Sequence, residues 1–268
     1  MDKESTLNTT SLHITRWGDS GPRVVMIHGS AQGSAVGGDL HFSAQARLAE
    51  HGWRVLVPDR PGHGRSPSPG RPDDAEADGA WVAELLEEGA HLIGHSFGGC
   101  VALAAAAKRP SSVRSLTLIE PAMQMVAMHE RRVKLQVLPL LLARILPASS
   151  ATRAARFARL MHIPPELRGG SSPEELKRMG QGLARLRIPS KATLQRQLGD
   201  LQREGIPLRV VTGGWSPGIE AMADTVAALG GGRRLVIASP HHFPQLVSEE
   251  FNDFLAAFMK ESDARRSG

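Results

Sequence analysis

A serine between two glycines is the residue of this chain best suited to nucleophilic chemistry. Residues 91 to 107 read HLIGHSFGGCVALAAAA, which is a strand-like run, then GHSFG with Ser96 at its centre, then an alanine-rich helical pattern. A nucleophile on a sharp strand-to-helix turn needs very small residues two positions before and after it, because the backbones there come too close for a Cβ atom. Gly94 and Gly98 meet this need, so we predict that Ser96 is an activated nucleophile rather than part of a plain glycine-rich turn.

A second turn supplies groups that would complete an acyl-transfer site. The run VVMIHGSAQG ends a strand-like stretch in a glycine-containing turn with Ser30. Such a turn can aim the backbone N–H of Ser30 at a developing oxyanion, beside the N–H of Phe97, and we predict this pair as the oxyanion hole. A serine hydroxyl is a poor nucleophile alone, so a histidine must reach Ser96 and a carboxylate must hold that histidine.

The elements that position these residues alternate between short β-branched runs and helical patterns. This alternation predicts a mainly parallel sheet covered on both faces. The first two runs flank GDSGP, a turn-forming segment typical of an antiparallel hairpin. Helical patterns lie near residues 40 to 51, 73 to 88, 98 to 109, 218 to 229 and 247 to 260, and the predicted strands are SLHITRW, RVVMIHG, RVLVPDR, AHLIGHS, VRSLTLIE, PLRVVTGG and RRLVIAS.

Residues 121 to 206 interrupt this alternation. The segment has helical patterns broken by prolines and glycines but no convincing strand. We predict a helical insertion over the carboxyl edge of the sheet, where open α/β sheets place their ligand sites. A structural subdomain away from the site is the alternative. Residues 1 to 120 and 207 to 268 would then form one core domain.

Composition limits the classes of partner. The net charge is +5, and residues 121 to 206 alone hold 15 Lys and Arg against 6 Asp and Glu. No nucleic-acid-binding motif accompanies these arginines and the chain has no tyrosine, so we expect no nucleic-acid partner. The single Cys100 excludes an intrachain disulfide, and no signal peptide or spanning segment is visible, so we expect a soluble cytoplasmic protein without a membrane partner.

The order of the motifs resembles that of the α/β-hydrolase family. The HG turn, the PDRPGHGRS loop, GHSFGG and the late HHF occur in family order with family spacing over nearly the whole chain apart from the insertion. The resemblance implies an α/β-hydrolase fold, with a mostly parallel, doubly wound sheet and a helical cap, residues 121 to 206, inserted after the sixth strand. The resemblance also implies a structural role for His63. It implies that His28 and His95 are residues of the turn or support the site, and that neither is the base.

The resemblance also implies where the base lies. Chain order in the family is serine, acid, histidine, and ASPHHFPQ follows the last predicted strand. His242, followed by Phe243, matches the frequent Gly-His-Phe pattern of the family, with His241 in the glycine position. We therefore predict that His242 is the base, and His241 is the alternative.

The acid departs from the usual family pattern. After PLRVVTGG the family most often has an aspartate, whereas this chain has Ser216 there, which cannot stabilise an imidazolium as a carboxylate does. Some members, including certain lactone hydrolases and dehalogenases, place the acid one strand earlier, and that position here is Glu120 in LIEPA. We predict that Glu120 orients the base. Glu220 and then Asp224 are the alternative acids, and an exposed strand end is the structural alternative for Glu120.

These residues together predict hydrolysis of a carboxylic ester or lactone through an acyl-enzyme. A serine at the turn argues against dehalogenases, which resemble this sequence but use an aspartate there. Carbon–carbon bond hydrolysis uses the same triad, so it stays open as an alternative, as does a receptor-like ligand-binding member with negligible turnover. We expect a small apolar substrate in a pocket lined by Ala31, Met123 and Trp215. Ordinary packing of the methionine and leucine side chains is the alternative. No cofactor or metal site is expected.

Overall fold

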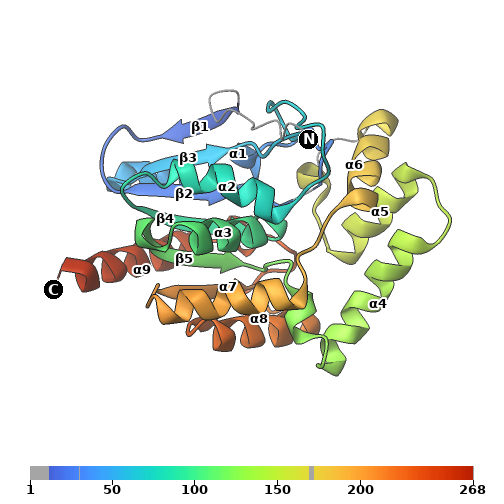
Figure 1. The fold of residues 1–268 in the computed structure, drawn as a ribbon. Coiled ribbons are helices and arrows are strands. Elements are labelled where there is room, and N and C mark those ends of the chain that lie inside the picture. The colour runs from blue at the N-terminus through green and yellow to red at the C-terminus, as the bar shows by residue number, and fades with distance from the viewer. Residues whose placement is uncertain (1–11, 30, 169–171, 268) are drawn as a thin grey trace, which may run out of the picture.

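A seven-stranded sheet forms the centre of the part of the chain that the structure describes, residues 12–29, 31–168 and 172–267 of a computed structural model (Figure 1). The strand order is β1-β3-β2-β4-β5-β6-β7. All neighbouring strands are parallel except β1 and β3, so the α/β-hydrolase architecture expected from the sequence is confirmed. The strands are β1 (Ile14–Trp17), β2 (Arg23–Ile27), β3 (Arg54–Pro58), β4 (Ala90–His95), β5 (Val113–Ile119), β6 (Leu208–Thr212) and β7 (Arg233–Val236).

The predicted hairpin between the first two strands is wrong. β1 pairs antiparallel with β3, because both edges of β2 are taken by β3 and β4. The connection between β1 and β2 therefore crosses the start of β3. Gly18 and Gly21 both have positive φ on this crossing, and a Cβ on Gly21 would lie 1.9 Å from the carbonyl oxygen of Gly52.

Helices cover both faces of the sheet, and the strand side chains alternate between two apolar clusters. Val25 and Ile27 face one cluster with α2 (Ala75–Leu85), α3 (Phe97–Lys108) and α8 (Pro217–Leu229). Val24 and Met26 face the other cluster, with residues of η2 (Ser43–His51) and α9 (Glu249–Ser267). Because both faces are covered, β2 is buried along its whole length. The short elements α1 (Gly38–His41), η3 (Pro110–Ser112) and η6 (Pro244–Leu246) complete this layer arrangement.

A helical segment follows β5 and lies beyond the carboxyl ends of the strands (Figure 1). It comprises η4 (Gln124–Ala127), α4 (Arg131–Ile145), α5 (Ser150–Leu160), η5 (Pro165–Leu167) and α6 (Pro173–Arg185). The segment follows β5, the fifth described strand, whereas the expected position was after the sixth strand. Serine caps set two of its helix starts: Ser149 accepts from the N–H of Thr152, and Ser172 forms a capping box with Glu175.

The next helix, α7 (Lys191–Arg203), packs with the core helices rather than with α4 to α6. Leu194, Leu198 and Leu201 belong to the main apolar cluster, and α7 contacts α3 and α8. The predicted insertion ended at residue 206 and so included α7, because the sequence pattern shows that a helix is amphipathic but not which surface it covers. We use the term cap for α4 to α6, and the division of the chain into domains stays a prediction.

Candidate active site

Ser96 lies on a strained turn between β4 and α3. Its φ of 54° and ψ of −124° are rare for a residue with a side chain. A Cβ on Gly94 would lie 2.5 Å from the carbonyl oxygen of Gly98, and one on Gly98 would lie 2.2 Å from that of Ile27. Both positions therefore require glycine, as the sequence predicts. Ser96 is partly exposed, while its neighbours on the turn are buried.

Glu120 follows β5 and contacts His242 directly. The Nδ1 atom of His242 lies 2.5 Å from Oε2 of Glu120, and both residues are buried. The exposed strand end considered for Glu120 is therefore wrong, because only 2% of this residue is accessible. With Nδ1–H donating to the carboxylate, Nε2 of His242 carries the lone pair, and it has no hydrogen-bond partner among the described residues. A base of this tautomer, oriented by a carboxylate, is what activation of a serine requires.

The loop after β6 supplies two more donors to Glu120. The N–H of Gly213 lies 2.8 Å from Oε1, and the indole N–H of Trp215 lies 2.9 Å from Oε1 and 3.1 Å from Oε2. Glu120 itself has a positive φ of 40°. An ionised carboxylate can accept several such bonds. In the family this loop usually carries the acid itself. Here the loop instead donates hydrogen bonds to Glu120, which follows the neighbouring strand β5.

The alternative acids and the alternative base have other partners. Glu220 accepts from the hydroxyl of Thr212 at 2.7 Å and from the N–H of Gly214 at 3.0 Å, and it pairs with Arg234. Asp224 also pairs with Arg234. The first histidine of the HHF motif, His241, uses Nδ1 to accept from the N–H of Phe243 at 3.2 Å, which stabilises the local turn.

The predicted oxyanion turn lies against Ser96, the predicted nucleophile. A Cβ on Gly29 would lie 2.7 Å from the Cβ of Ser96, and Phe97 is the first residue of α3, where backbone N–H groups are not used by the helix. The predicted second donor, Ser30, falls outside the described residues. Ala31 is buried with Ala154, Met179 and Leu183 of the cap, so this turn also forms part of the contact between core and cap.

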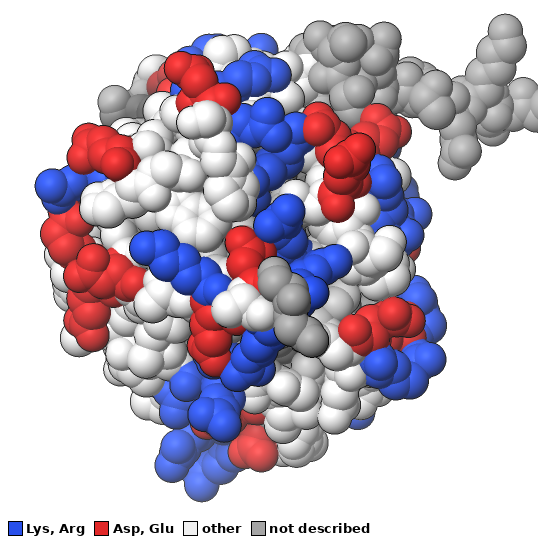
Figure 2. All heavy atoms as spheres, turned by 90° about the vertical axis from the view of Figure 1, so that its left-hand side faces the viewer, with Lys and Arg blue, Asp and Glu red and all other residues white. Residues whose placement is uncertain are grey.

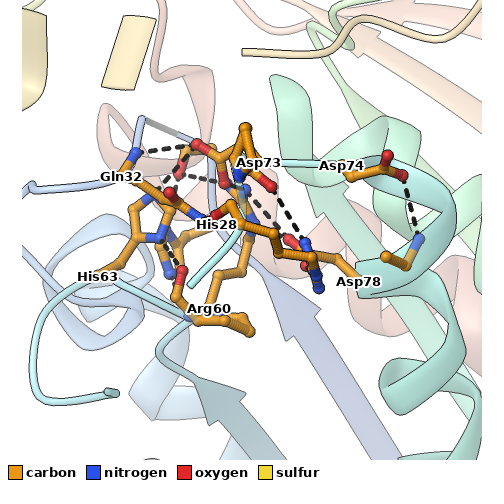
Figure 3. Close-up of polar contacts among 12 residues, drawn as sticks. His28, Gln32, Arg60, His63, Asp73, Asp74 and Asp78 are labelled. Atoms are coloured by element: carbon orange, nitrogen blue, oxygen red, sulfur yellow. Dashed lines mark hydrogen bonds and ion pairs between the residues drawn. The ribbon is translucent and has the colours of Figure 1, made fainter. Parts of the chain in front are cut away.

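A buried ionic network beneath this turn was missed by the reasoning from sequence. Arg60 is fully buried between Asp73 and Asp78, and Figure 3 shows the guanidinium pointing at these carboxylates. Arg60 also donates to the carbonyl oxygen of Gly29 at 3.2 Å, and Asp73 accepts from the N–H of Gln32 at 2.9 Å. The network therefore fixes both ends of the turn that carries Ser30 and Ala31. The combination of an arginine in the loop motif with two nearby aspartates was the available signal.

Four buried histidines lie behind the site. His28 contributes Nδ1 to the carbonyl oxygen of Gly29 at 2.8 Å and accepts from the N–H of Arg60 at 2.9 Å, so it is a neutral turn residue. His95 lies 2.7 Å from the carbonyl oxygen of His242, through Nε2. Burial lowers the pKa of both His28 and His95 well below the usual value, and it lowers the pKa of His63 to about 3 and that of His41 to about 4. None of the four is placed as the base of Ser96.

The predicted pocket residues have different surroundings. Met123 is fully buried in the main apolar cluster, where ordinary packing accounts for it. Trp215 is partly buried and stacks on His162 of the cap, with ring centroids 4.7 Å apart. An open cleft of about 480 Å³ lies beside the loop that carries His241 and His242. Its lining residues are Leu40, Ser43, Ala44, Pro164, Glu166, Leu167, His241 and Leu246.

Comparison with known proteins places this geometry in context. A family model described as the alpha/beta hydrolase fold matches residues 22–197. The chain is 39% identical over 130 residues to the lipase LipV of Mycobacterium tuberculosis, a match that covers 46% of this chain and 45% of that protein. It is 28% identical over 210 residues to a pimeloyl-[acyl-carrier protein] methyl ester esterase of Aeromonas hydrophila, covering 74% of this chain and 76% of that protein. The aligned stretch spans less than half the length of LipV and of several other curated relatives.

Solved structures share the fold at low sequence identity. Est816, described as an N-acyl homoserine lactone degrading enzyme, superposes with a TM-score of 0.67 at 19% identity, covering 92% of this chain and 96% of that one. The esterase EaEST of Exiguobacterium antarcticum gives a TM-score of 0.67 at 20% identity, covering 93% and 95%. These likenesses show the arrangement of strands and helices.

Proposed function

We propose that this chain, which belongs to the α/β-hydrolase fold family, is a serine hydrolase that cleaves carboxylic esters or lactones. The observation that carries the proposal is the buried contact between Glu120 and Nδ1 of His242, made next to the strained turn of Ser96. A carboxylate, an imidazole with a free Nε2 and a serine on a strand-to-helix turn are the three parts that acyl transfer needs. The names of relatives, which include a lipase, esterases and a lactone-degrading enzyme, support the same class.

In the proposed reaction, Oγ of Ser96 attacks the substrate carbonyl carbon while its proton passes to Nε2 of His242. Glu120 stabilises the imidazolium that forms. The oxyanion accepts hydrogen bonds from the N–H of Phe97 and from the predicted second donor, Ser30. His242 then gives its proton to the departing alkoxide, which leaves an ester on Ser96.

Hydrolysis of this acyl-enzyme uses the same groups. Nε2 of His242 removes a proton from a water molecule as its oxygen attacks the acyl carbon, and the proton is returned to Oγ of Ser96 when the carboxylic acid leaves. No external oxidant or cofactor is needed for either half.

We also propose a cytoplasmic location, which the single buried thiol of Cys100 supports.

Covalent labelling tests the proposal. Wild type should react rapidly with a fluorophosphonate probe at one site, detected by intact mass, and Ser96→Ala should not react. Glu120→Gln should react at least a hundredfold more slowly, because the base loses the charge that stabilises its protonated form. Glu220→Gln is the matched control, since its carboxylate serves Thr212 and Arg234, and it should label at nearly the wild-type rate.

Two outcomes would change the proposal. Equal labelling of wild type and Glu120→Gln would show that another acid holds the base. No labelling of the wild type, together with thermal stabilisation by esters and no turnover of a short nitrophenyl ester, would favour the receptor-like alternative. Turnover of a carbon–carbon ring-cleavage product in preference to esters would favour the second enzymatic alternative.

A further inference from the structure

The outer face of α4 is exposed and apolar. Among the described residues, six of the ten large hydrophobic side chains that are exposed belong to this helix or to its C-terminal cap. Leu135 is 61% exposed, Leu138 is 52% exposed and Ile145 is 64% exposed. With Leu142 these residues follow helical spacings of three and four, so they form one stripe along the helix.

This stripe is not needed to attach α4 to the molecule. Val133 and Ala143 are buried on the opposite side, and Val137 and Leu140 pack against the main apolar cluster. Through that side α4 contacts α8, α5 and η4, and Figure 1 shows it along the outer edge of the cap. A helix that is apolar on both faces normally has a partner on each, so the outer stripe is a candidate interaction surface.

The charge around the stripe is mainly positive, and the exposed N-cap residue of α4, Glu130, is the acidic exception. Residues 131 to 165 contain seven Lys and Arg and no Asp or Glu. Arg131 and Lys134 are exposed, and their spacing from Leu135 and Leu138 places them on the same side of α4. The end of the molecule opposite the cap differs, because Figure 2 shows Lys and Arg side chains there interspersed with Asp and Glu.

We propose that α4 docks on an anionic membrane surface. Leucine and isoleucine side chains would enter the boundary between headgroups and acyl chains, while the flanking cations would meet lipid phosphates. A second copy of the chain fits less well, because pairing two such faces would bring like charges together. None of the described helices is long and apolar enough to cross a membrane, so α4 would lie in the interface. The expectation of no membrane partner rested on the lack of a spanning segment, which does not bear on a helix of this kind.

This attachment is independent of the proposed triad. The stripe contains neither Ser96, His242 nor Glu120, so vesicle binding and ester hydrolysis can be measured separately. A failure of one proposal therefore leaves the other standing.

Sedimentation with vesicles tests the surface. The full chain would be mixed with large unilamellar vesicles of phosphatidylglycerol or of phosphatidylcholine. Wild type should partition at least tenfold better into the phosphatidylglycerol vesicles, and 0.5 M salt, about three times a physiological ionic strength of 0.15 M, should remove most of this preference. Arg131→Gln combined with Lys134→Gln should weaken binding by about fivefold per charge removed.

A second pair of changes tests the apolar stripe. Leu138→Glu combined with Ile145→Glu should reduce partition into phosphatidylglycerol vesicles at least tenfold, with the turnover of a short soluble ester unchanged. Ile188→Glu introduces one glutamate at a 43% exposed position outside α4 and should bind nearly like the wild type, as a control for acidic charge placed elsewhere. Equal or negligible binding of the wild type to both lipids would overturn the proposal. A dimer in light scattering that the α4 changes dissociate, without vesicle binding, would overturn it in favour of a second copy.

Discussion

The indole N–H of Trp215 lies within hydrogen-bonding distance of both carboxylate oxygens of Glu120, at 2.9 and 3.1 Å. The same ring stacks on His162, which lies between α5 and η5 of the cap. One side chain therefore joins the carboxylate that contacts His242 to the helical segment that follows β5. A change at Trp215 should act on the orientation of the acid, and a change at His162 should act mainly on the stacking.

Trp215→Phe tests the contribution of the N–H. Phenylalanine keeps a ring that can stack on His162 but cannot donate to Glu120, so we expect kcat/KM for a short ester to fall about tenfold, the equivalent of one hydrogen bond to a charged group. The free energy of unfolding should change less than activity does. His162→Ala is the control, and it should lower activity less than Trp215→Phe. The reverse order would show that stacking, not the N–H, positions the acid.

Arg60→Met should be severe, because it leaves Asp73 buried without its paired arginine and leaves Asp78 with Arg71 alone. Breaking a buried ion pair by removing one partner typically costs about 3–5 kcal/mol, and urea unfolding would measure this loss. Activity should fall as well, since Arg60 fixes the carbonyl of Gly29.

Arg47→Gln is the matched control for Arg60. Arg47 pairs with Glu249, and both side chains are more than half exposed. A surface pair of this kind is worth at most about 1 kcal/mol, so the unfolding curve should barely move. Similar losses for the two variants would show that the buried network adds nothing beyond a surface pair.

The parts of the site that could be predicted from sequence are local or follow from strand order. The need for glycine at positions 94 and 98 follows from the turn alone. The contact between Glu120 and His242 could be anticipated because the motif order matched a known family in which this strand end lies near the base.

The features that were missed depend on contacts between distant segments. Pairing of β1 with β3 rather than β2 depends on which edges of β2 are already occupied, and the turn sequence does not contain that information. Likewise, the loop motif does not show that Arg60 turns inward while the neighbouring Arg65 stays half exposed. Leucines at helical spacing appear in both α4 and α7, yet they are exposed in one helix and buried in the other.

The buried histidines predict a loss of stability in acid. Burial lowers the pKa of His41 to about 4, whereas the unfolded chain has a value of about 6.5. Below about pH 6.5 the unfolded state binds protons that the folded state does not, so stability is full above this pH and falls as the pH drops toward 4. Each such histidine contributes up to about 1.4 kcal/mol per pH unit in this window.

His41→Phe tests this acid sensitivity. Urea unfolding would be measured at pH 7.5, 6.5, 5.5 and 5.0, which span about one unit above and 1.5 units below the unfolded pKa. Because phenylalanine does not titrate, the variant should lose less stability over this range than the wild type. His51→Phe changes an exposed histidine and should leave the slope as it is. An unchanged slope for His41→Phe would mean that the other buried groups govern the acid transition.

Two glycine-to-alanine changes should have opposite signs. Gly98→Ala would place a Cβ 2.2 Å from the carbonyl oxygen of Ile27 and 2.5 Å from that of His28, two backbone atoms at the end of β2 that cannot move without disturbing the sheet. We expect the free energy of unfolding to fall by about 1–3 kcal/mol or more, the usual cost of overpacking, and probe labelling at Ser96 to be lost. Gly199→Ala, in the middle of α7, would meet no atom within 4 Å and should stabilise the protein by about 0.5–1 kcal/mol, because alanine restricts the unfolded chain and favours the helix. Thermal and urea unfolding of both variants would measure these changes. Comparable stability of Gly98→Ala and the wild type would contradict the close approach of β2 to the turn on which the proposed nucleophile depends.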